Sequence, residues 1–272
     1  MGEVNIKDVQ QKLYERLKPS GWGDKLKVFL LSDEFNTILT TLLRESQAGE
    51  KFTPVIKQIF RAFEECPYEE LKVVMIGQDP YPKAEVADGI AFSCSNTQEV
   101  QASLRYMFIE IESTVYPEGY EWDPNLARWS NQGVLMLNTA LTTGVGKIGK
   151  HVDLWKPFIA FLLDVLAHSN SGLVYAFLGS KAREWAKNVP ANNFKCFATH
   201  PASAAYRGQA GWDSGNLFNQ VNQILYQNNG VKITWQATLH DLCHTKRNSA
   251  NVPMSWRIKV WWILNKRVRL RR

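Results

Sequence analysis

The sequence has little cysteine and no long apolar run. Four cysteines lie scattered through 272 residues without CxxC spacing, so a disulfide framework is not expected, and reduced thiols are typical of a cytoplasmic or nuclear protein. No apolar run reaches the roughly 20 residues that a membrane-spanning helix needs, and residues 1–11 lack the apolar core of a secretion signal. We therefore expect no membrane span and no secretion.

Several common catalytic motifs are also missing. The chain contains no GxSxG elbow, no phosphate-binding P-loop and no HExxH zinc motif. A sugar hydrolase would need a second acid beside Asp79, and the nearby Glu85 and Asp88 do not follow a predicted strand. Three possible ligands, His240, Cys243 and His244, lie close together in the tail. Without a second ligand cluster we expect no metal and no cofactor.

Positive charge is concentrated at the C-terminal end. Residues 236–272 hold nine Lys or Arg and one acid, a net +8, which leaves the other residues at −2 of the total +6. Trp256, Trp261 and Trp262 are interleaved with these cations. Such a segment is able to bind nucleic acid, a partner protein or a membrane surface, or to be a solubilising end without a fixed role.

Four short apolar runs predict the strands of one sheet. They span residues 73–76, 134–137, 173–178 and 194–198. Each run is nearly continuous rather than alternating, as expected for strands covered on both faces. Because helical patterns separate them, we predict an α/β fold: a three-layer sandwich with a central, largely parallel four-stranded sheet flanked by helices.

Apolar residues at helical spacing predict three helices whose apolar faces lie in the core. One covers residues 35–42. A second begins at Thr53-Pro54, with Thr as N-cap and Pro in the first turn, and a third follows Pro157. Their apolar faces carry Phe35, Ile38, Leu39 and Leu42; Ile56, Ile59, Phe60 and Phe63; and Phe158, Phe161, Leu162, Val165 and Leu166.

Polar residues follow each predicted strand. Gln78-Asp79 comes after the first, Asn138 after the second, Gly179-Ser180 after the third, and His200 after the fourth. Ligands of open α/β sheets bind beyond the carboxyl ends of the strands, so these residues are expected to converge on one cleft.

This set suits cleavage of an N-glycosidic bond to an acidic base. Uracil leaves as an anion, so the reaction needs a donor near the departing oxygen and a carboxylate near the cationic sugar and the water. His200 is a candidate donor and Asp79 a candidate carboxylate. The Asn138 amide matches the donor and acceptor of uracil's pairing edge, whereas cytosine presents the reverse pattern.

Residues 72–81, Lys-Val-Val-Met-Ile-Gly-Gln-Asp-Pro-Tyr, resemble the water-activating motif of family-1 uracil-DNA glycosylases. The similarity runs from about residue 21 to residue 235, with motifs in family order. The other stretches that resemble this family are residues 59–63, 89–93, 132–139, 179–180 and 200–208.

The resemblance implies a role for each matching residue. Asp79 would orient water and stabilise the oxocarbenium-like sugar, and His200, as a neutral imidazole, would hydrogen-bond uracil O2. Asn138 would read the base edge. Phe92 would stack on uracil, Tyr81 would exclude a 5-methyl group, and Gln78 would line the pocket. The implied contacts to DNA, which hold the backbone while the base is flipped out of the stack, are made by Pro80, Ser103, Gly179, Ser180, Pro201, Ala202, Ser203, Tyr206 and Arg207.

The chain departs from the family pattern in three places. Pro82 stands where many members have His. The loop of residues 200–206 lacks the Leu that normally wedges into the base stack, and Ala204 or Ala205 would take its place. Because alanine buries little area, weaker retention of a flipped base and a relative preference for single strands are expected. Residues 236–272 are additional to the family domain.

We therefore predict an N-terminal segment over 1–20, a catalytic domain over 21–235 and a basic extension over 236–272. The predicted activity is monofunctional release of uracil from single- or double-stranded DNA by a monomer, in base excision repair. Expected partners are a DNA-mimic inhibitor or replication proteins. The alternatives are an inactive accessory protein of the same fold and a glycosylase for another base, which Tyr81 and Asn138 disfavour.

Overall fold

The computed structural model describes residues 5–209 and 211–237. Its elements all belong to the unit Met1–Trp235. In chain order they are α1 (Ile6–Leu17), α2 (Trp22–Leu30), α3 (Asp33–Gln47), β1 (Phe52–Thr53), the 3₁₀ turn Ile56–Gln58, α4 (Arg61–Glu65), the 3₁₀ turn Tyr68–Glu70, β2 (Val73–Gly77), α5 (Ala102–Thr114), α6 (Ala127–Ser130), β3 (Val134–Asn138), β4 (Thr143–Gly144), α7 (Val152–Ser169), β5 (Val174–Leu178), α8 (Ser180–Arg183), the 3₁₀ turn Glu184–Asn188, β6 (Phe194–Ala198), α9 (Ala202–Tyr206) and α10 (Leu217–Asn229).

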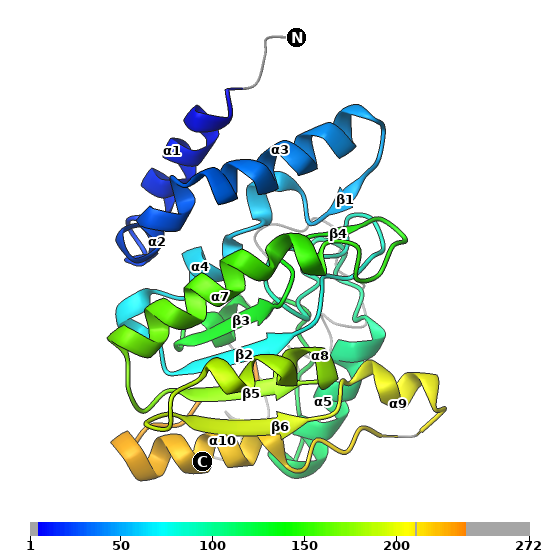
Figure 1. Cartoon of the computed structure of the whole chain (residues 1–272). Coiled ribbons are helices and arrows are strands. Elements are labelled where there is room, and N and C mark those ends of the chain that lie inside the picture. Colours follow the sequence, from blue (N-terminus) through cyan, green and yellow to red (C-terminus); the bar gives the residue numbers. More distant parts are fainter. Residues whose placement is uncertain (1–4, 210, 238–272) are drawn as a thin grey trace, which may run out of the picture. The chain divides into compact units, whose positions relative to one another are not determined.

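A four-stranded sheet in the order β3-β2-β5-β6 forms the centre, and every neighbouring pair is parallel. Helices lie on both sides of it (Figure 1). The predicted three-layer α/β sandwich is therefore confirmed. All four predicted strands are present, within one residue of the expected bounds.

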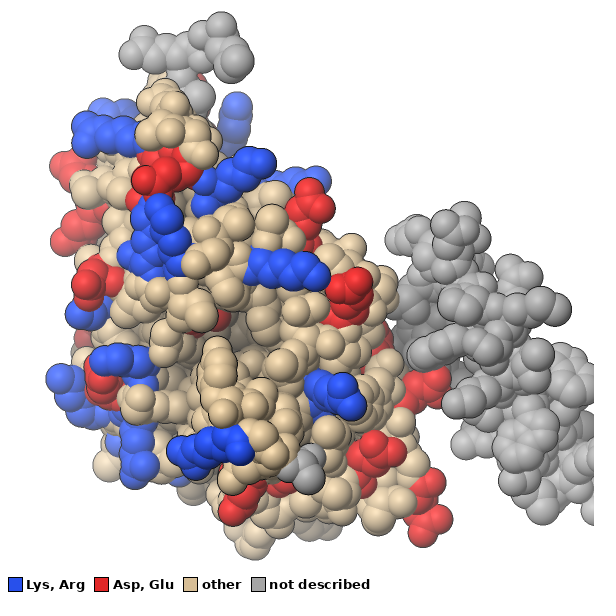
Figure 2. All heavy atoms as spheres, turned by 90° about the vertical axis from the view of Figure 1, so that its right-hand side faces the viewer, with Lys and Arg blue, Asp and Glu red and all other residues tan. Residues whose placement is uncertain are grey.

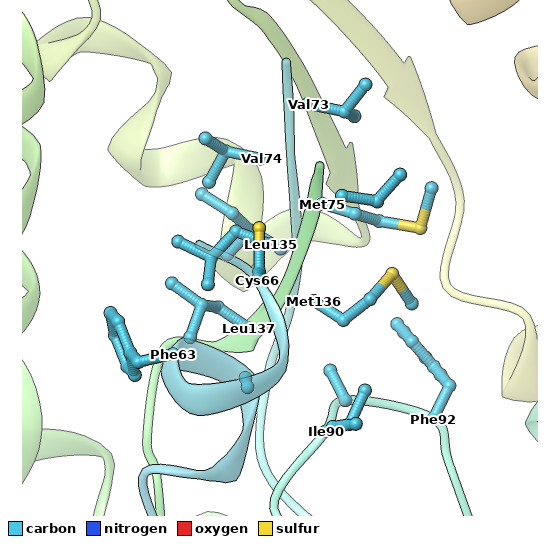
Figure 3. Close-up of a cluster of buried hydrophobic side chains, with 14 of the residues drawn as sticks. Phe63, Cys66, Val73, Val74, Met75, Ile90, Phe92, Leu135, Met136 and Leu137 are labelled. Carbon is cyan, nitrogen blue, oxygen red and sulfur yellow. The ribbon is translucent and has the colours of Figure 1, made fainter. Parts of the chain in front are cut away.

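Three of the four strands are buried on both faces, as the continuous apolar runs predict, but the prediction is wrong for the edge strand β6, in which Phe194 and Phe197 are exposed. Every residue of β2, β3 and β5 is buried. Val74 points toward Phe63 of α4, whereas Met75 lies on the opposite side of the strand, with Phe92 (Figure 3). Period-2 alternation thus sends successive apolar side chains into two separate layers of core.

Phe158 of α7 lies at the centre of an aromatic cluster above one face of the sheet. Its ring centroid is 5.4 Å from that of Phe29, 5.5 Å from Phe60 and 5.8 Å from Phe63, all with edge-on geometry. Edge-to-face contact is the favoured arrangement of aromatic rings. The cluster therefore joins α2, α4 and α7 into one layer.

Two predicted helix starts are wrong. Thr53 does not cap a helix, because Phe52–Thr53 pairs with Thr143–Gly144 as a two-residue antiparallel ladder. Ile56, expected in the core, is 58% exposed. The helix containing Pro157 begins five residues earlier than predicted, at Val152, and the proline lies inside it. The helix over residues 35–42 is confirmed as part of α3, with the four predicted residues buried.

The N-terminal helix contributes to the core. α1 packs against α2 and α3, and its Leu13, Tyr14 and Leu17 are buried. Residues 6–17, assigned from the sequence to a separate segment, thus share the hydrophobic core of the unit. The division into a 1–20 segment, a 21–235 domain and a 236–272 extension stays a prediction, since the extension lies almost wholly outside the described residues.

Replacement of Phe158 tests the role of the aromatic cluster. Phe158→Ala removes a fully buried ring and leaves a cavity, so the free energy of unfolding should fall by about 3–5 kcal/mol in urea denaturation. Val28→Ala is the control, because Val28 is 76% exposed, and should change that free energy by less than about 0.5 kcal/mol. Equal effects of the two changes would contradict this packing.

Candidate active site

The carboxyl ends of the parallel strands bring the predicted site residues to one edge of the sheet. Asn138 is the last residue of β3 and is paired with Gly77 of β2, which Gln78 and Asp79 follow directly. Gly179 follows β5, and His200 follows β6 by two residues. The convergence expected from the sequence therefore has a structural basis in the parallel register.

A cleft of about 440 Å³ opens at this edge. Figure 2 views the side of the molecule on which the strands end and shows a hollow bordered mostly by uncharged side chains. The lining residues are Gln78, Asp79, Pro80, Tyr81, Pro82, Phe92, Gln101, Ala102, Ser103, Ile148, His200, Ala202, Ser203, Ala205 and Tyr206.

Asp79 is the carboxylate of this cleft. Its Oδ2 accepts a hydrogen bond from the backbone N–H of Gly149 at 2.6 Å. Burial raises the pKa of Asp79 above its ordinary value, although hydrogen bonds from Gly149, the Thr143 hydroxyl and the Gln78 side chain oppose the rise. Asp79 is thus a stronger base than a free aspartate.

The protonation of His200 is fixed by its neighbours. Its Nδ1 accepts a hydrogen bond from the Ala202 N–H at 3.2 Å, so in the neutral ring the proton resides on Nε2. Burial lowers the pKa of His200, which favours the neutral form. Gly179 makes room for the ring, because a Cβ there would lie 3.0 Å from the His200 Cβ. His200 therefore presents an N–H donor.

Asn138 does not line the main cleft. It is buried and lines a smaller adjoining cavity that shares Pro80, Tyr81 and Phe92 with the cleft. A Cβ at Gly77 would lie 2.5 Å from Asn138 Oδ1 and 2.9 Å from Phe92 Cζ. The amide and the Phe92 ring thus both lie close over Gly77, and Phe92 lines the cleft as well as the smaller cavity.

The loop that carries Phe92 is organised by Asp88. This fully buried carboxylate accepts hydrogen bonds from Ser93 Oγ at 2.6 Å and the Ser95 N–H at 2.9 Å, and it pairs with Arg61 at 2.9 Å. Phe92 has φ 64°, an unfavourable value for a non-glycine residue. Asp88 therefore has a structural role that sequence reasoning missed, since it was weighed only as a second catalytic acid.

Most of the predicted DNA contacts lie at the cleft. Pro80, Ser103, Ala202, Ser203 and Tyr206 line it, whereas Gly179, Ser180, Pro201 and Arg207 are absent from its lining. Gly179 and Ser180 adjoin the cleft through the contact of Gly179 with His200. Their roles in DNA binding stay predictions.

Of the two alanines expected in place of the wedge, Ala205 lines the cleft, whereas Ala204 does not. Ala204 is completely buried, because α9 turns it inward. Tyr206, at the C-terminal end of the same helix, is 82% exposed and lines the cleft. The most exposed side chain of this helix is therefore an aromatic ring.

The described residues form neither a metal-binding cluster nor a membrane-spanning helix. Within residues 5–209 and 211–237, no group of three or more His, Cys, Asp or Glu is arranged to hold a metal ion. In the same part of the chain, no helix has the length and apolar character that crossing a bilayer requires. His240, Cys243, His244 and the tryptophans of the extension lie outside the described residues.

Comparison with known proteins gives one consistent result. The sequence profile of the uracil DNA glycosylase superfamily matches residues 63–226. A uracil-DNA glycosylase of Acinetobacter baumannii strain SDF is 32% identical over 231 residues, which cover 84% of this chain and 96% of that protein. The uracil-DNA glycosylase of Mesomycoplasma hyopneumoniae strain 7448 is 32% identical over 203 residues, 74% of this chain and 90% of that protein.

Solved structures share the fold. The crystal structure of mimivirus uracil-DNA glycosylase superposes with a TM-score of 0.73 at 22% identity, covering 82% of this chain and 89% of that one. A variant of the mimivirus protein in complex with UGI gives the same TM-score, 0.73, at 23% identity, covering 81% of this chain and 91% of that one.

Gly77→Ala tests the close approach of Asn138 and Phe92. The added Cβ would overlap both side chains, so the free energy of unfolding should fall by about 1–3 kcal/mol in urea denaturation. Gly211→Ala is the matched control, because a Cβ there has nothing within 4 Å, and it should be nearly neutral. Unchanged stability of Gly77→Ala would show that the two side chains do not meet over Gly77.

Proposed function

The chain belongs to the uracil DNA glycosylase superfamily, and from this premise we propose that Asp79, Asn138 and His200 divide the chemistry of uracil release among them. The protein is a uracil-DNA glycosylase. Water replaces uracil at C1′ of the deoxyribose, the N-glycosidic bond breaks, and an abasic site remains in the DNA. The observation that carries the assignment of roles is the presence of Asp79 and His200 in one cleft.

Asp79 acts on the sugar and the water. Asp79 lies two residues beyond the carboxyl end of β2. Its raised pKa makes the carboxylate a better acceptor for the proton of the attacking water. While ionised, it also stabilises the positive charge that develops on the deoxyribose. The Gly149 N–H donates to Oδ2 and holds the carboxylate in place.

His200 acts on the leaving base. Electron density moves onto uracil as the bond breaks, and the Nε2–H of a neutral imidazole donates to uracil O2. The hydrogen bond from Ala202 fixes this tautomer. A neutral donor stabilises the uracil anion without protonating it, which suits a base that is already a good leaving group.

Asn138, Phe92 and Tyr81 select uracil. The Asn138 amide supplies one donor and one acceptor, which match uracil and leave cytosine with unpaired groups. Phe92 lines both the cleft and the adjoining cavity that holds Asn138, a position suited to stacking on a base that the amide binds. Tyr81 lines both cavities, and its hydroxyl donates to the Phe92 carbonyl at 3.0 Å, a position suited to excluding a 5-methyl group.

Tyr206 replaces the leucine wedge. An exposed aromatic ring beside the cleft is able to stack between bases and to fill the space that a flipped nucleotide leaves. The alternative, in which Ala205 takes the place of the wedge and single strands are preferred, stays a prediction.

A DNA-mimic inhibitor is expected to cover the same cleft. Replication proteins that compete with DNA are also expected to bind there. The monomeric state stays a prediction.

Asp79→Asn tests the catalytic assignment. Uracil release from a single-stranded oligonucleotide should fall by about 10²–10⁴-fold. The fold should persist, because the folded protein disfavours the Asp79 charge at neutral pH, and the amide removes that charge. A thermal melt should show a midpoint no lower than that of the parent. Near-parent activity would refute the assigned role of Asp79.

Tyr206→Ala tests the wedge. Release from duplex DNA should fall about tenfold more than release from the same sequence as a single strand, since stacking is worth about 1–3 kcal/mol per base. Tyr226→Ala is the control, because Tyr226 is 59% exposed on α10 and lines no part of the cleft, and it should leave the ratio unchanged. A parent-like ratio for Tyr206→Ala would mean that another group fills the stack.

A further inference from the structure

The hydrogen bond that holds Asp79 comes from a loop outside the recognised motifs. Residues 145–151 connect β4 to α7, and Gly149 in this loop donates to Asp79 Oδ2. Backbone contacts fix the first half of the loop, because the Val145 N–H donates to Lys51 O and the Gly146 N–H to Pro82 O, both at 2.9 Å. The position of Gly149 depends further on the residues that follow it.

Those residues are tied to the C-terminal end of α3. Lys150 Nζ lies 2.8 Å from Glu45 Oε1 and also pairs with Glu50, which accepts from Lys147 as well. Glu45 belongs to the last turn of α3, and Glu50 follows that helix. The carboxylates of Glu45 and Glu50 thus both bind the loop that contacts Asp79.

A buried histidine completes the connection. His151 Nε2 lies 2.9 Å from Glu45 Oε2, and Nδ1 lies 2.8 Å from Thr142 Oγ1. The Thr142 oxygen accepts from Trp155 Nε1 at 2.8 Å, which leaves its own proton for His151 Nδ1. Burial lowers the pKa of His151, in agreement with a neutral ring that donates from Nε2 to Glu45. Both Glu45 oxygens are therefore engaged by the two residues that follow Gly149.

We propose that Glu45 is a positioning residue for Asp79, because through Lys150 and His151 it holds the Gly149 N–H against the Asp79 carboxylate. The proposal rests on the catalytic role proposed for Asp79. Glu45 does not line the cleft; it acts on the orientation of the carboxylate and on the strength of the hydrogen bond that the carboxylate receives.

A weaker hydrogen bond from Gly149 to Asp79 should change the acid limb of the activity, that is, the range of low pH over which kcat falls. The groups that act on the pKa of Asp79 are burial, which raises it, and the hydrogen bonds from Gly149, Thr143 and Gln78, which lower it. His200 lines the same cleft and loses its neutral form only below its own lowered pKa. If the hydrogen bond from Gly149 is weakened, less opposes the rise in pKa that burial causes. The pKa of Asp79 should then be higher, so the carboxylate should protonate at higher pH.

Glu45→Gln is the main test, since the amide keeps the shape but offers one acceptor to two donors. With a single-stranded uracil oligonucleotide, kcat should fall by between about tenfold and a hundredfold, and KM should change by less than about threefold. The acid limb of kcat should move to higher pH. A parent-like kcat, or a lower kcat with an unmoved acid limb, would overturn the proposal.

Asp153→Asn is the matched control. Asp153 is two residues from His151, pairs with Lys156 on the solvent side of α7 and is 89% exposed, so its removal disturbs the helix but not the loop. Its kcat and acid limb should match the parent. If Glu45→Gln fails to fold, Lys150→Gln takes its place as the test. A smaller shift of the acid limb of kcat to higher pH in Lys150→Gln would support the proposal, and an unmoved acid limb would overturn it. An active Asp79→Asn would instead defeat the catalytic assignment itself.

Discussion

The parallel alignment of β2, β3, β5 and β6 is the constraint on which the active site depends. Of these strands, β2, β3 and β5 are buried along their length, and all four deliver their next residues to the same edge of the sheet. Asp79 and His200 are 121 positions apart in the chain and still line one cleft. The apolar strands therefore do more than fill the core, because their register sets which polar groups meet.

The same burial that stabilises the sheet tunes the two reactive groups. It raises the pKa of Asp79 and lowers that of His200, so at neutral pH a basic carboxylate faces a neutral imidazole. Hydrogen bonds then fix each group: Gly149 holds Asp79, and Ala202 holds His200. As the glycosidic bond breaks, the Asp79 carboxylate stabilises the cationic sugar, and the His200 N–H donor stabilises the anionic base.

The sequence predicted the features that depend on local patterns and missed those that depend on distant contacts. Continuous apolar runs were sufficient for the strands and for the residues that follow them. Thr53 failed as a helix cap because it pairs with Thr143, far along the chain. The burial of Ala204 follows from the orientation of α9, and the contact between Glu45 and His151 spans 106 residues; neither leaves a local signal.

The most direct test of this account is a crystal structure of the protein with free uracil. Uracil should lie in the cleft, with the Phe92 ring stacked on the base. The Asn138 amide would then lie along the pairing edge, and His200 Nε2 within hydrogen-bond distance of O2. Uracil bound elsewhere, or bound without contact to Asn138, Phe92 and His200, would contradict the assigned roles.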